Sequence, residues 1–546
     1  MGYVDAQDLQ YSLPTGRAIL EGASFRVGEG VKAALLGNNG TGKTTMLRIL
    51  YGLLEPHAGT VARSGHIAFM QQFIGTIRDA TTVRDLLVSL APASVRTAAH
   101  DLASSEATMA TAPTSEENQM RYAQALADYA DVGGYECETF WDECCQVVLG
   151  QSWDAASVRP VGALSGGEQK RLSLEALLRG PHEVVLLDEP DNALDVPGKL
   201  WLEEALRHSA KTILLVSHDR EVISAVANRI ITIENRTTWI HMGGYDTYEH
   251  ARAARHEQLD VMRRLWDEER ARLKELVRVL GVQAKQSPTM APRLRAMKSR
   301  LARFEQDGPP EKAPSGQTLR MRLQGGRTGV KVVTCTKLAL TGLTRPFSAD
   351  LYYGERLAVL GSNGSGKSHL LRLLAEGGTD PDPGSVASFA GNEHVPTAHT
   401  GTCKLGARVR VAHFSQNHEH TGWAGLELKE ILWQDFSDQR GPAISALGRY
   451  GLQAEEQHTF TQLSGGQQAR FQVLVIEKSG ANLLLLDEPT DNLDIASAEA
   501  LEEALRQFDG TVVAVTHDRW FARSFERFLV FREDGSVVET AEPVWD

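Results

Sequence analysis

The stretch GNNGTGKT at residues 37–44 decides the fold, and the same pattern returns as GSNGSGKS at residues 361–368. In G-x-x-x-x-G-K-[ST], the glycines let backbone N–H groups surround phosphates, the lysine reaches the outer phosphates, and the hydroxyl residue binds Mg²⁺. Each stretch follows an apolar strand pattern and precedes a helical one, the order that a phosphate-binding loop requires. The candidate nucleotide-binding residues are Gly37, Asn38, Asn39, Gly40, Thr41, Gly42, Lys43 and Thr44 in the first loop, and Gly361, Ser362, Asn363, Gly364, Ser365, Gly366, Lys367 and Ser368 in the second.

Three further motifs repeat. LSGGEQ at 164–169 returns as LSGGQQ at 463–468, VVLLDEPDNALD at 184–195 as LLLLDEPTDNLD at 483–494, and VSHDR at 216–220 as VTHDR at 515–519. Asp188 and Asp487 are 299 residues apart, as are His218 and His517, so this half of each copy has no net insertion. Strand patterns alternating with helical patterns predict a parallel α/β sheet in each copy. We therefore expect two α/β P-loop domains, at residues 1–249 and 326–546, joined by a linker at 250–325.

The Asp-Glu pairs that end two apolar strands are candidate catalytic groups. Asp188 and Asp487 stand where a carboxylate can hold Mg²⁺, and Glu189 and Glu488 are placed to act as general bases on an attacking water. A single Asp-Glu pair is as readily a solvated acidic cap, but repetition beside the two glycine loops favours the catalytic interpretation.

The Ser-Gly-Gly sequences open helical patterns. They present a hydroxyl and unobstructed N–H groups at a positive helix end, which suits the terminal phosphate of a nucleotide. One copy alone would be read as an ordinary serine cap. The residues are Ser165, Gly166 and Gly167 in the first copy and Ser464, Gly465 and Gly466 in the second.

Together these motifs resemble the ABC ATPase family, over both copies. The glycine loops look like its Walker A motifs, LSGGEQ and LSGGQQ like its signature, LLDEP like its Walker B, and the two Leu-Asp pairs that follow like its D-loops. The resemblance implies that His218 and His517 contact the γ-phosphate as switch histidines. It also implies that Gln72 and Gln416 lie near Mg²⁺ and the attacking water, with Gln71 as a rival for Gln72. Thr44, Ser368, Asp188 and Asp487 would complete the metal sites.

The family pairs its domains head to tail. Site one would then combine the first glycine loop, Glu189 and His218 with Ser464–Gly466, and site two the second loop, Glu488 and His517 with Ser165–Gly167. Because both copies retain the glutamate, we expect both sites to hydrolyse ATP. Tyr11 stands where the family often stacks an aromatic ring on adenine. The matching residue in copy two is Leu340, which predicts weaker or less selective base binding there.

The linker has the pattern of a helical hairpin. Apolar residues recur every three or four positions from Asp246 to Leu280 and again from Arg293 to Glu305, and the segment between, from Gly281 to Pro292, predicts a turn. Residues 251–328 hold 18 bases and 9 acids, whereas the whole chain has 57 bases and 70 acids. Such segregation favours a local contact with a polyanion such as RNA, although a solvated helix face is the plainer alternative. The bases of the returning helix are Arg293, Arg295, Lys298, Arg300 and Arg303.

The first copy also carries an insertion before its signature. Gln72 to Ser165 spans 93 residues, while Gln416 to Ser464 spans 48. We expect a helical arm within residues 73–163. With 5 bases and 13 acids it is a poor phosphate binder, and its segment ATMATAPTSEEN at 107–118 is expected to be flexible.

Composition sets the remaining limits. The chain of 546 residues, 42% hydrophobic and 23% charged, is that of a soluble protein with two or three domains. No apolar run approaches the roughly 18–20 residues of a membrane span, and the N-terminus lacks a signal core. Five cysteines without C-x-x-C predict reduced thiols and argue against zinc or iron–sulfur sites. We expect a cytoplasmic monomer whose two ATPase copies pair within the chain.

Two kinds of ABC protein fit these features. A transporter ATPase subunit needs only a short connector, whereas soluble ABC-F proteins resemble this chain in their charged helical linker, and GGYDTYEH at 243–250 resembles its entry. The ABC-F resemblance implies a ribosomal partner, with the linker near the P-site tRNA and the peptidyl-transferase centre. Within that class, the composition, the linker tip and the unusual arm favour protection from antibiotics over housekeeping translation control.

Overall fold

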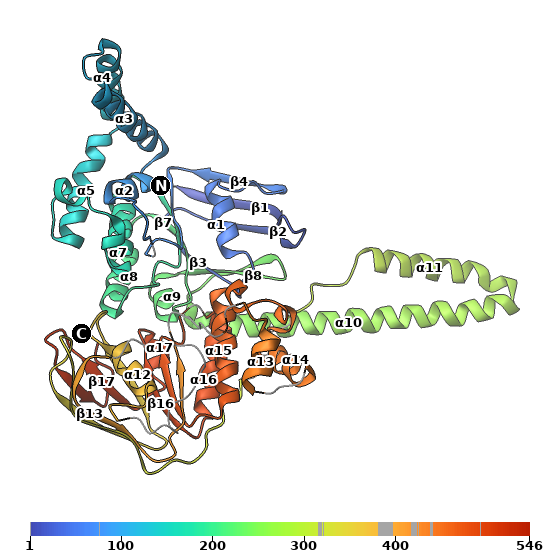
Figure 1. The fold of residues 1–546 in the computed structure, drawn as a ribbon. Coiled ribbons are helices and arrows are strands. Elements are labelled where there is room, and N and C mark those ends of the chain that lie inside the picture. The colour runs from blue at the N-terminus through green and yellow to red at the C-terminus, as the bar shows by residue number, and fades with distance from the viewer. Residues whose placement is uncertain are drawn as a thin grey trace.

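Two sheets of one plan organise the two halves of the chain (Figure 1). The computed structural model describes residues 2–545 except 76, 315–318, 320, 381–396, 416–422, 424, 437–439 and 492. Among these residues, the first sheet has the order β5-β6-β7-β3-β8-β9 and the second β14-β15-β16-β12-β17-β18. The strands of the first are β3 (Lys32–Leu36), β5 (Ile67–Met70), β6 (Val184–Asp188), β7 (Thr212–Val216), β8 (Arg229–Glu234) and β9 (Thr237–His241). Those of the second are β12 (Arg356–Gly361), β14 (Val411–Phe414), β15 (Leu483–Asp487), β16 (Thr511–Val515), β17 (Arg527–Phe531) and β18 (Val537–Thr540).

The central strands pair in parallel and are buried along their length. Every residue of β6, β7, β15 and β16 is buried, which explains why these strands read as unbroken apolar runs in the sequence. In each sheet the first five strands are parallel and the last pair is antiparallel. The carboxyl ends of β3, β6 and β7 therefore meet at one edge of the first sheet, and those of β12, β15 and β16 at one edge of the second.

A smaller antiparallel sheet accompanies each half. The first consists of β1 (Tyr3–Ser12), β2 (Ala18–Val27) and β4 (Ala58–Ser64), and the second of β10 (Lys331–Leu340), β11 (Phe347–Tyr352) and β13 (His399–Leu405). Asp8 in β1 and Lys337 in β10 share a positive φ, 50° and 49°, at interruptions of the strand register. The same irregularity thus occurs in both copies, and it places Tyr11 and Leu340 at equivalent positions three residues later.

Helices at the carboxyl edges carry the motifs. In the first half they are α1 (Lys43–Tyr51), α7 (Gly166–Arg179), α8 (Val196–His208) and α9 (Arg220–Val226). In the second they are α12 (Lys367–Ala375), α15 (Gly465–Ser479), α16 (Ile495–Arg506) and α17 (Arg519–Ala522). Each begins directly after a glycine loop, a signature, a D-loop or a switch histidine, so the helix N-termini are directed at the nucleotide sites.

The insertion of the first copy forms a helical arm, whose middle part protrudes from the body (Figure 1). It contains α2 (Val83–Leu90), α3 (Ala93–Thr111), α4 (Glu116–Asp131), α5 (Gly134–Leu149) and α6 (Trp153–Ala156). The segment at 107–118, which the sequence predicts to be flexible, is helical at both of its ends. The helix α3 continues through Thr111, and Ser115 caps α4 by accepting a hydrogen bond from the Asn118 N–H at 3.4 Å. Polar composition did not prevent helix formation because Ala, Met and Glu are good helix formers and the serine supplies a cap.

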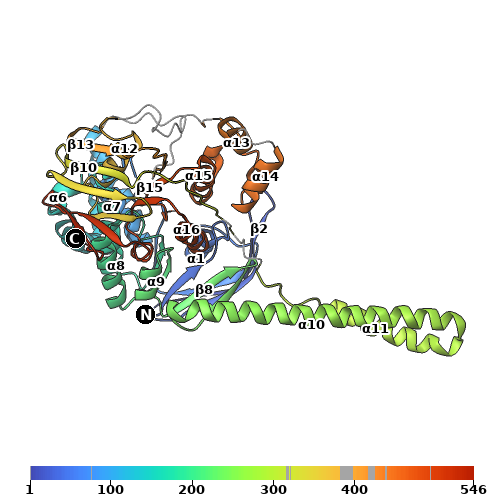
Figure 2. The same cartoon turned by 90° about the horizontal axis from the view of Figure 1, so that it is seen from below.

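The linker is a long helical hairpin that projects from the body in both views (Figures 1 and 2). Its outgoing helix is α10 (Tyr245–Gln286), its tip is the 3₁₀ turn η2 (Pro288–Met290), and its returning helix is α11 (Ala291–Gln306). The hairpin is confirmed, but the turn is shorter than expected because α10 runs through Gly281. Glycine inside a helix costs only about 1 kcal/mol, and the helix ends where Pro288 follows Ser287.

The two helices of the hairpin pack through aromatic and ionic contacts. Trp266 of α10 stacks on Phe304 of α11 with ring centroids 5.3 Å apart, and Arg270 pairs with Glu305 at 2.8 Å. No helix in the described part of the chain has both the length and the apolar character to cross a membrane.

We predict that Trp266→Ala loosens the hairpin without unfolding the ATPase domains. Losing the stacked ring removes about 1–2 kcal/mol of local stability, so amide hydrogen exchange in α11 should accelerate about tenfold. Hydrogen exchange with mass spectrometry measures this. Leu265→Ala is the matched control, because Leu265 is 60% exposed. Equal exchange in the two variants would contradict the packing role of Trp266.

Candidate functional site

The two glycine loops have the same backbone geometry. Gly42 and Gly366, which cap α1 and α12, have φ of 100° and 104°, a left-handed conformation that favours glycine. A Cβ on Gly42 would lie 2.3 Å from Cγ2 of Ile19. Glycine is therefore required at this point both for the turn and for the close packing of the loop on β2.

Each loop lysine lies folded over its own loop. Lys43 Nζ donates to the carbonyl of Gly37 at 2.7 Å, and Lys367 Nζ donates to that of Gly361 at 2.7 Å. Both lysines are buried, and burial lowers the pKa of each. A buried ammonium surrounded by backbone N–H groups forms a strong anion site.

The Walker B aspartates offer oxygen ligands beside the loop hydroxyls. Ser368 Oγ donates to Asp487 Oδ1 at 3.1 Å. Within the described part of the chain, neither carboxylate oxygen of the buried Asp188 has a hydrogen-bond partner, and burial raises the pKa of both aspartates. A carboxylate beside a hydroxyl, completed by phosphate oxygens, suits a hard divalent cation, so these residues fit Mg²⁺. The described residues hold no cluster of three or more His, Cys, Asp or Glu side chains that would bind a metal without such a ligand.

The two glutamates share a strained backbone but have different neighbours. Glu189 and Glu488 have φ of 51° and 49°, which costs about 1–3 kcal/mol each for residues with a side chain. Glu189 Oε2 accepts from the amides of Gln72 at 2.7 Å and Asn192 at 2.6 Å. Two amide donors directed at one oxygen fix the orientation of the carboxylate, while burial and then the neighbouring Asp188 raise its pKa.

Glu488 accepts from a backbone donor instead. The His517 N–H donates to Glu488 Oε2 at 2.9 Å. Burial first, and then the Asp491 carboxylate, raise the pKa of Glu488 to about 8. The residue that corresponds to Asp491 in copy one is Asn192, so an amide in one site stands where a carboxylate stands in the other. The two sites are chemically unequal.

The switch histidines are half-buried, and both have a lowered pKa that favours the neutral ring. Burial and the nearby Lys43 lower the pKa of His218 to about 3, and within the described residues neither of its ring nitrogens has a hydrogen-bond partner. Burial likewise lowers the pKa of His517, whose Nε2 lies 3.1 Å from Asn363 Oδ1 in the glycine loop. A neutral imidazole with an unused nitrogen can still exchange a hydrogen bond with a phosphate oxygen.

The first glycine loop and the second signature line one cavity. This cavity of about 560 Å³ is bounded on one side by Lys43, Thr44, Gln72 and Glu189, and on the other by the Ser464–Gly466 segment. Ser464 caps α15 through a reciprocal box with Gln467. The structure thus brings together residues of site one from both copies. It places Gln72, rather than Gln71, beside Glu189, since Gln71 lines a separate pocket at the root of the arm.

In the second site the loop approaches the D-loop region of copy one. Asn363 Nδ2 donates to the carbonyl of Ala193 at 3.5 Å. Ser165 caps α7 with the same reciprocal box as its counterpart, here with Glu168. Gln416 lies outside the described residues.

The two candidate base-stacking residues differ in exposure. The Tyr11 ring packs against His57 with centroids 5.3 Å apart, and the nearby Leu13, Arg17 and Ile19 line the site-one cavity. Leu340 is fully buried in the core beneath Gly366. The sequence predicts unequal base binding at the two sites, and the two side chains at this position also differ in exposure.

Reciprocal contacts hold the two copies together. Arg220 of α9 pairs with Glu502 of α16, and Arg519 of α17 pairs with Glu203 of α8. The two pairs are equivalent in the repeat, because Arg519 lies 299 residues after Arg220 and Glu502 lies 299 residues after Glu203. Asp494 of the second D-loop also accepts from the Asn39 N–H of the first glycine loop at 3.0 Å. Each copy therefore completes the site of the other.

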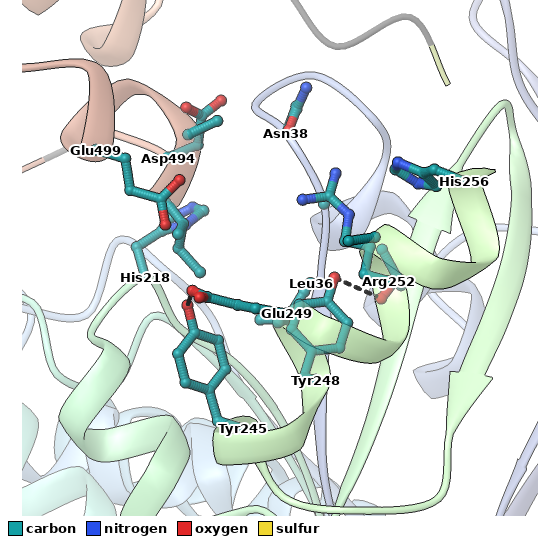
Figure 3. A pocket seen from close by; sticks show the side chains of 15 residues that line it. Leu36, Asn38, His218, Tyr245, Tyr248, Glu249, Arg252, His256, Asp494 and Glu499 are labelled. Carbon is teal, nitrogen blue, oxygen red and sulfur yellow. Dashed lines mark hydrogen bonds between the residues drawn. The ribbon is translucent and has the colours of Figure 1, made fainter. Parts of the chain in front are cut away.

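The root of the linker lies against the first site. A cavity of about 290 Å³ separates the first turns of α10 from the switch histidine His218 and from Asp494 and Glu499 of copy two (Figure 3). On the linker side it is lined by Tyr245, Tyr248, Glu249, Arg252 and His256.

This root is fastened to the first copy by polar contacts. The Tyr248 and Thr232 hydroxyls are 2.9 Å apart, and the buried Glu234 of β8 accepts from Arg252 at 2.6 Å and contacts His256 at 3.0 Å. Burial, and then the facing Glu249 carboxylate, raise the pKa of Glu499. The linker is thus anchored to one copy, while the Glu499 carboxylate of the other copy lies near both Glu249 and Arg252 of the root.

The motifs did not identify Asn192, Asp491 or Lys199. The first two occupy the same position in the Walker B alignment, and a comparison of DEPDNALD with DEPTDNLD shows the exchange of amide and carboxylate. Lys199 of α8 lies in an ordinary helical pattern. Its contact with the carbonyl of His517 is made across the domain interface, and no local sequence pattern indicates it.

Comparison with known proteins agrees with this geometry. The profile of the family described as ABC transporter matches residues 20–192 and 344–491. An "Antibiotic resistance protein" of Mycobacteroides abscessus is 54% identical over the full length of both chains. The "Tylosin resistance ATP-binding protein TlrC" of Streptomyces fradiae is 32% identical over 97% of this chain and 95% of its own. The "Energy-dependent translational throttle protein EttA" of Mycobacterium tuberculosis is 30% identical over 92% of this chain and 87% of its own.

We predict that Glu189→Gln and Glu488→Gln each lower steady-state ATP turnover and that the double variant lowers it at least about a hundredfold. A glutamine fills the same space but cannot accept the proton of the attacking water, and a general base contributes about 10²–10⁴ in rate. Phosphate release measures turnover, and equilibrium binding of ATP checks that the sites still bind. Glu503→Gln, at an exposed position, is the control. Unchanged turnover in either single variant would rule out hydrolysis at that site.

Proposed function

Because this chain belongs to the ABC-F family of tandem ABC ATPases and hydrolyses ATP, we propose that it binds the ribosome and protects it from antibiotics. In this proposal ATP binding draws the two copies together, and the closed pair holds the linker hairpin in the ribosome near the P-site tRNA and the peptidyl-transferase centre. Hydrolysis then releases it. The observation that carries the proposal is a basic hairpin fixed by its root to an ATP site.

Within each site we assign the residues as follows. Lys43 and Lys367, with the backbone of their loops, bind the phosphates, and the Ser-Gly-Gly segment of the opposite copy closes on the terminal phosphate. Thr44 and Asp188, with Gln72, would hold Mg²⁺ in site one, and Ser368 and Asp487, with Gln416, would hold it in site two. When bound, the metal neutralises charge on the phosphate oxygens. Glu189 and Glu488 polarise the attacking water, and His218 and His517 contact the terminal phosphate.

The charge of the hairpin supports a nucleic-acid partner. All five candidate bases of α11 are exposed: Arg293, Arg295, Lys298, Arg300 and Arg303. Leu294, Met297, Leu301 and Phe304 lie half-buried on the inner face, so the bases are directed away from α10. Arg300 also reaches Glu269 at 3.4 Å, an exposed ion pair that is weak enough to exchange for a phosphate.

The contacts at the linker root support coupling between ATP and the hairpin. Glu249 of α10 faces Glu499 of copy two across the 290 Å³ cavity that also contains His218 (Figure 3). A change in the separation of the copies changes the repulsion between these carboxylates and the room available to the first turns of α10. The equilibrium position of the hairpin is therefore expected to depend on the nucleotide state.

The relatives support resistance over housekeeping control. Two of the three carry antibiotic resistance in their names, and one of these is 54% identical over the full length. The third is named as a translational throttle at 30% identity. All three names are compatible with a ribosomal partner in the cytoplasm, where we place this protein. A transporter ATPase subunit remains the competing function that the first experiment below excludes.

We predict that the Glu189→Gln/Glu488→Gln variant, bound to ATP, sediments with ribosomes. Adding the three charge reversals of the hairpin to this variant should abolish its sedimentation with ribosomes; these are Arg295→Glu, Lys298→Glu and Arg300→Glu. Reversing three charges that face RNA phosphates removes the contribution of counterion release to the binding free energy, so ribosome binding should fall at least tenfold. For the same reason, ribosome binding by the protein without the charge reversals should weaken steeply as the salt concentration rises. Sucrose-cushion sedimentation at two salt concentrations measures it.

The matched control reverses three exposed bases elsewhere, Arg207, Arg345 and Arg506, with the same change in net charge. If the hairpin variant binds ribosomes as tightly as the parent, the bases of α11 form only a solvated helix face. Recovery of the trapped protein only with membranes would instead establish the transporter alternative.

We predict that expression of the protein in a sensitive host raises the minimal inhibitory concentration of at least one macrolide, lincosamide or pleuromutilin by fourfold or more. The resistance named for two of the relatives is the reason for the panel. The hairpin variant with three reversed charges, expressed at the same level, should confer no protection. Growth inhibition measured across the panel decides between a resistance protein and a housekeeping translation factor. A housekeeping factor would leave the minimal inhibitory concentration of every drug unchanged.

A further inference from the structure

A buried lysine that only the first copy carries joins the two ATP sites. Lys199 lies in the first turn of α8, and the equivalent residue in α16 is Ala498. Its Nζ lies 2.9 Å from Asp219 Oδ2 and donates to the carbonyl of His517 at 3.2 Å. The side chains of Lys199 and Asp219 are only 9% and 4% exposed. One ammonium therefore bridges the segment after His218 in the first copy and the switch histidine of the second.

The His517 peptide extends this link to the second site. Its carbonyl accepts from Lys199, while its N–H donates to Glu488 Oε2 at 2.9 Å and its ring contacts Asn363 of the glycine loop. A shift of Lys199 therefore moves the donor that orients the Glu488 carboxylate. Ala498, the equivalent residue of copy two, has a methyl group without a donor, so it cannot make the corresponding contact with the carbonyl of His218.

The first copy carries a second charge that the other copy lacks. Asp191 is 3% exposed, and the equivalent residue in copy two is Thr490. Burial, and then the neighbouring Asp219, raise the pKa of Asp191 to about 6, while Lys199 lowers it. Copy one thus buries the Asp191 and Lys199 charges where copy two has a half-buried threonine and a buried alanine. The fold can evidently be built with neutral residues at these two positions, and buried charges are costly unless they are paired.

We propose that Lys199 is a positioning residue for the second ATP site. It holds the His517 peptide, and through it the Glu488 carboxylate, in the arrangement that hydrolyses ATP, and it ties that arrangement to the switch segment of the first site. The link is unsymmetrical, because the bridging ammonium belongs to the first copy and contacts the peptide that donates to Glu488. The inference rests on the proposed roles of His517 and Glu488.

The test measures each site separately. In a Glu189→Gln background, where only the second site turns over, Lys199→Met should lower kcat about tenfold and leave the KM for ATP within twofold, because orientation is lost while binding is kept. In a Glu488→Gln background, the same substitution should lower the kcat of the first site several-fold less. Equal losses at the two sites, or a parallel rise in KM, would overturn the proposal.

A charge-balanced variant separates positioning from stability. Lys199→Met alone leaves Asp191 and Asp219 buried without their cation, so part of its effect could come from a destabilised interface. Asp191→Thr/Lys199→Ala gives copy one the residues of copy two and removes both charges together. If this variant keeps the melting temperature of the parent and still has a lowered kcat at the second site, the positioning role holds. If it restores full turnover, Lys199 only balances charge and the proposal fails.

The same assay separates this inference from the proposed function. If Glu488→Gln leaves turnover unchanged, Glu488 is not the base, and the proposed site assignment fails together with the inference. If Glu488→Gln lowers turnover while Lys199→Met does not alter the second site, the inference alone fails. Ribosome sedimentation of the trapped protein is independent of both results.

Discussion

The structure depends on one contact made twice, the buried arginine–glutamate pair that each copy forms with the other. Arg220 with Glu502 and Arg519 with Glu203 are related by the repeat, so the interface has an approximate two-fold symmetry within one chain. Guanidinium groups removed from water are tolerated only when their partners are in place. The pairs therefore fix the register of the two copies, and with it the distance from each glycine loop to the opposite signature.

The symmetry of the interface does not extend to the chemistry of the sites. Glu189 is held by two amides, whereas Glu488 lies near the Asp491 carboxylate and accepts from a backbone N–H. Leu340 is buried where Tyr11 stands in copy one. A duplicated domain can keep its fold through the shared core while single substitutions at the interface give each site a different environment.

Most of the fold and most candidate site residues could be predicted because their information is local. A glycine loop, a strand ending in Asp-Glu and a serine-capped helix each lie within about ten residues, and their repetition excluded coincidence. The hairpin also followed from periodicity, although its turn was placed too early because Gly281 was read as a stop. Glycine is only a weak helix breaker, and the end of a helix is decided by the residues that follow it.

What the sequence could not provide are contacts between distant segments. Lys199 and His517 are separated by more than half the chain, and nothing in the pattern around Lys199 marks it as different from any surface lysine. The same holds for the attachment of α10, where Glu234 of β8 gathers Arg252 and His256. Which charged side chains form such pairs depends on which helix ends meet when the domains assemble, and a local sequence pattern does not contain that information.

The length of α10 has a mechanical consequence. At a rise of about 1.5 Å per residue, its 42 residues form a rod of about 63 Å. Because the contacts of the rod with β8 lie in its first turns, a tilt of about 5° there carries the tip through roughly 5 Å, the pitch of one helical turn. A small rearrangement at the root of the hairpin would therefore displace its tip by a distance comparable with the size of a nucleobase. The size of this displacement is set by the number of residues in one uninterrupted helix.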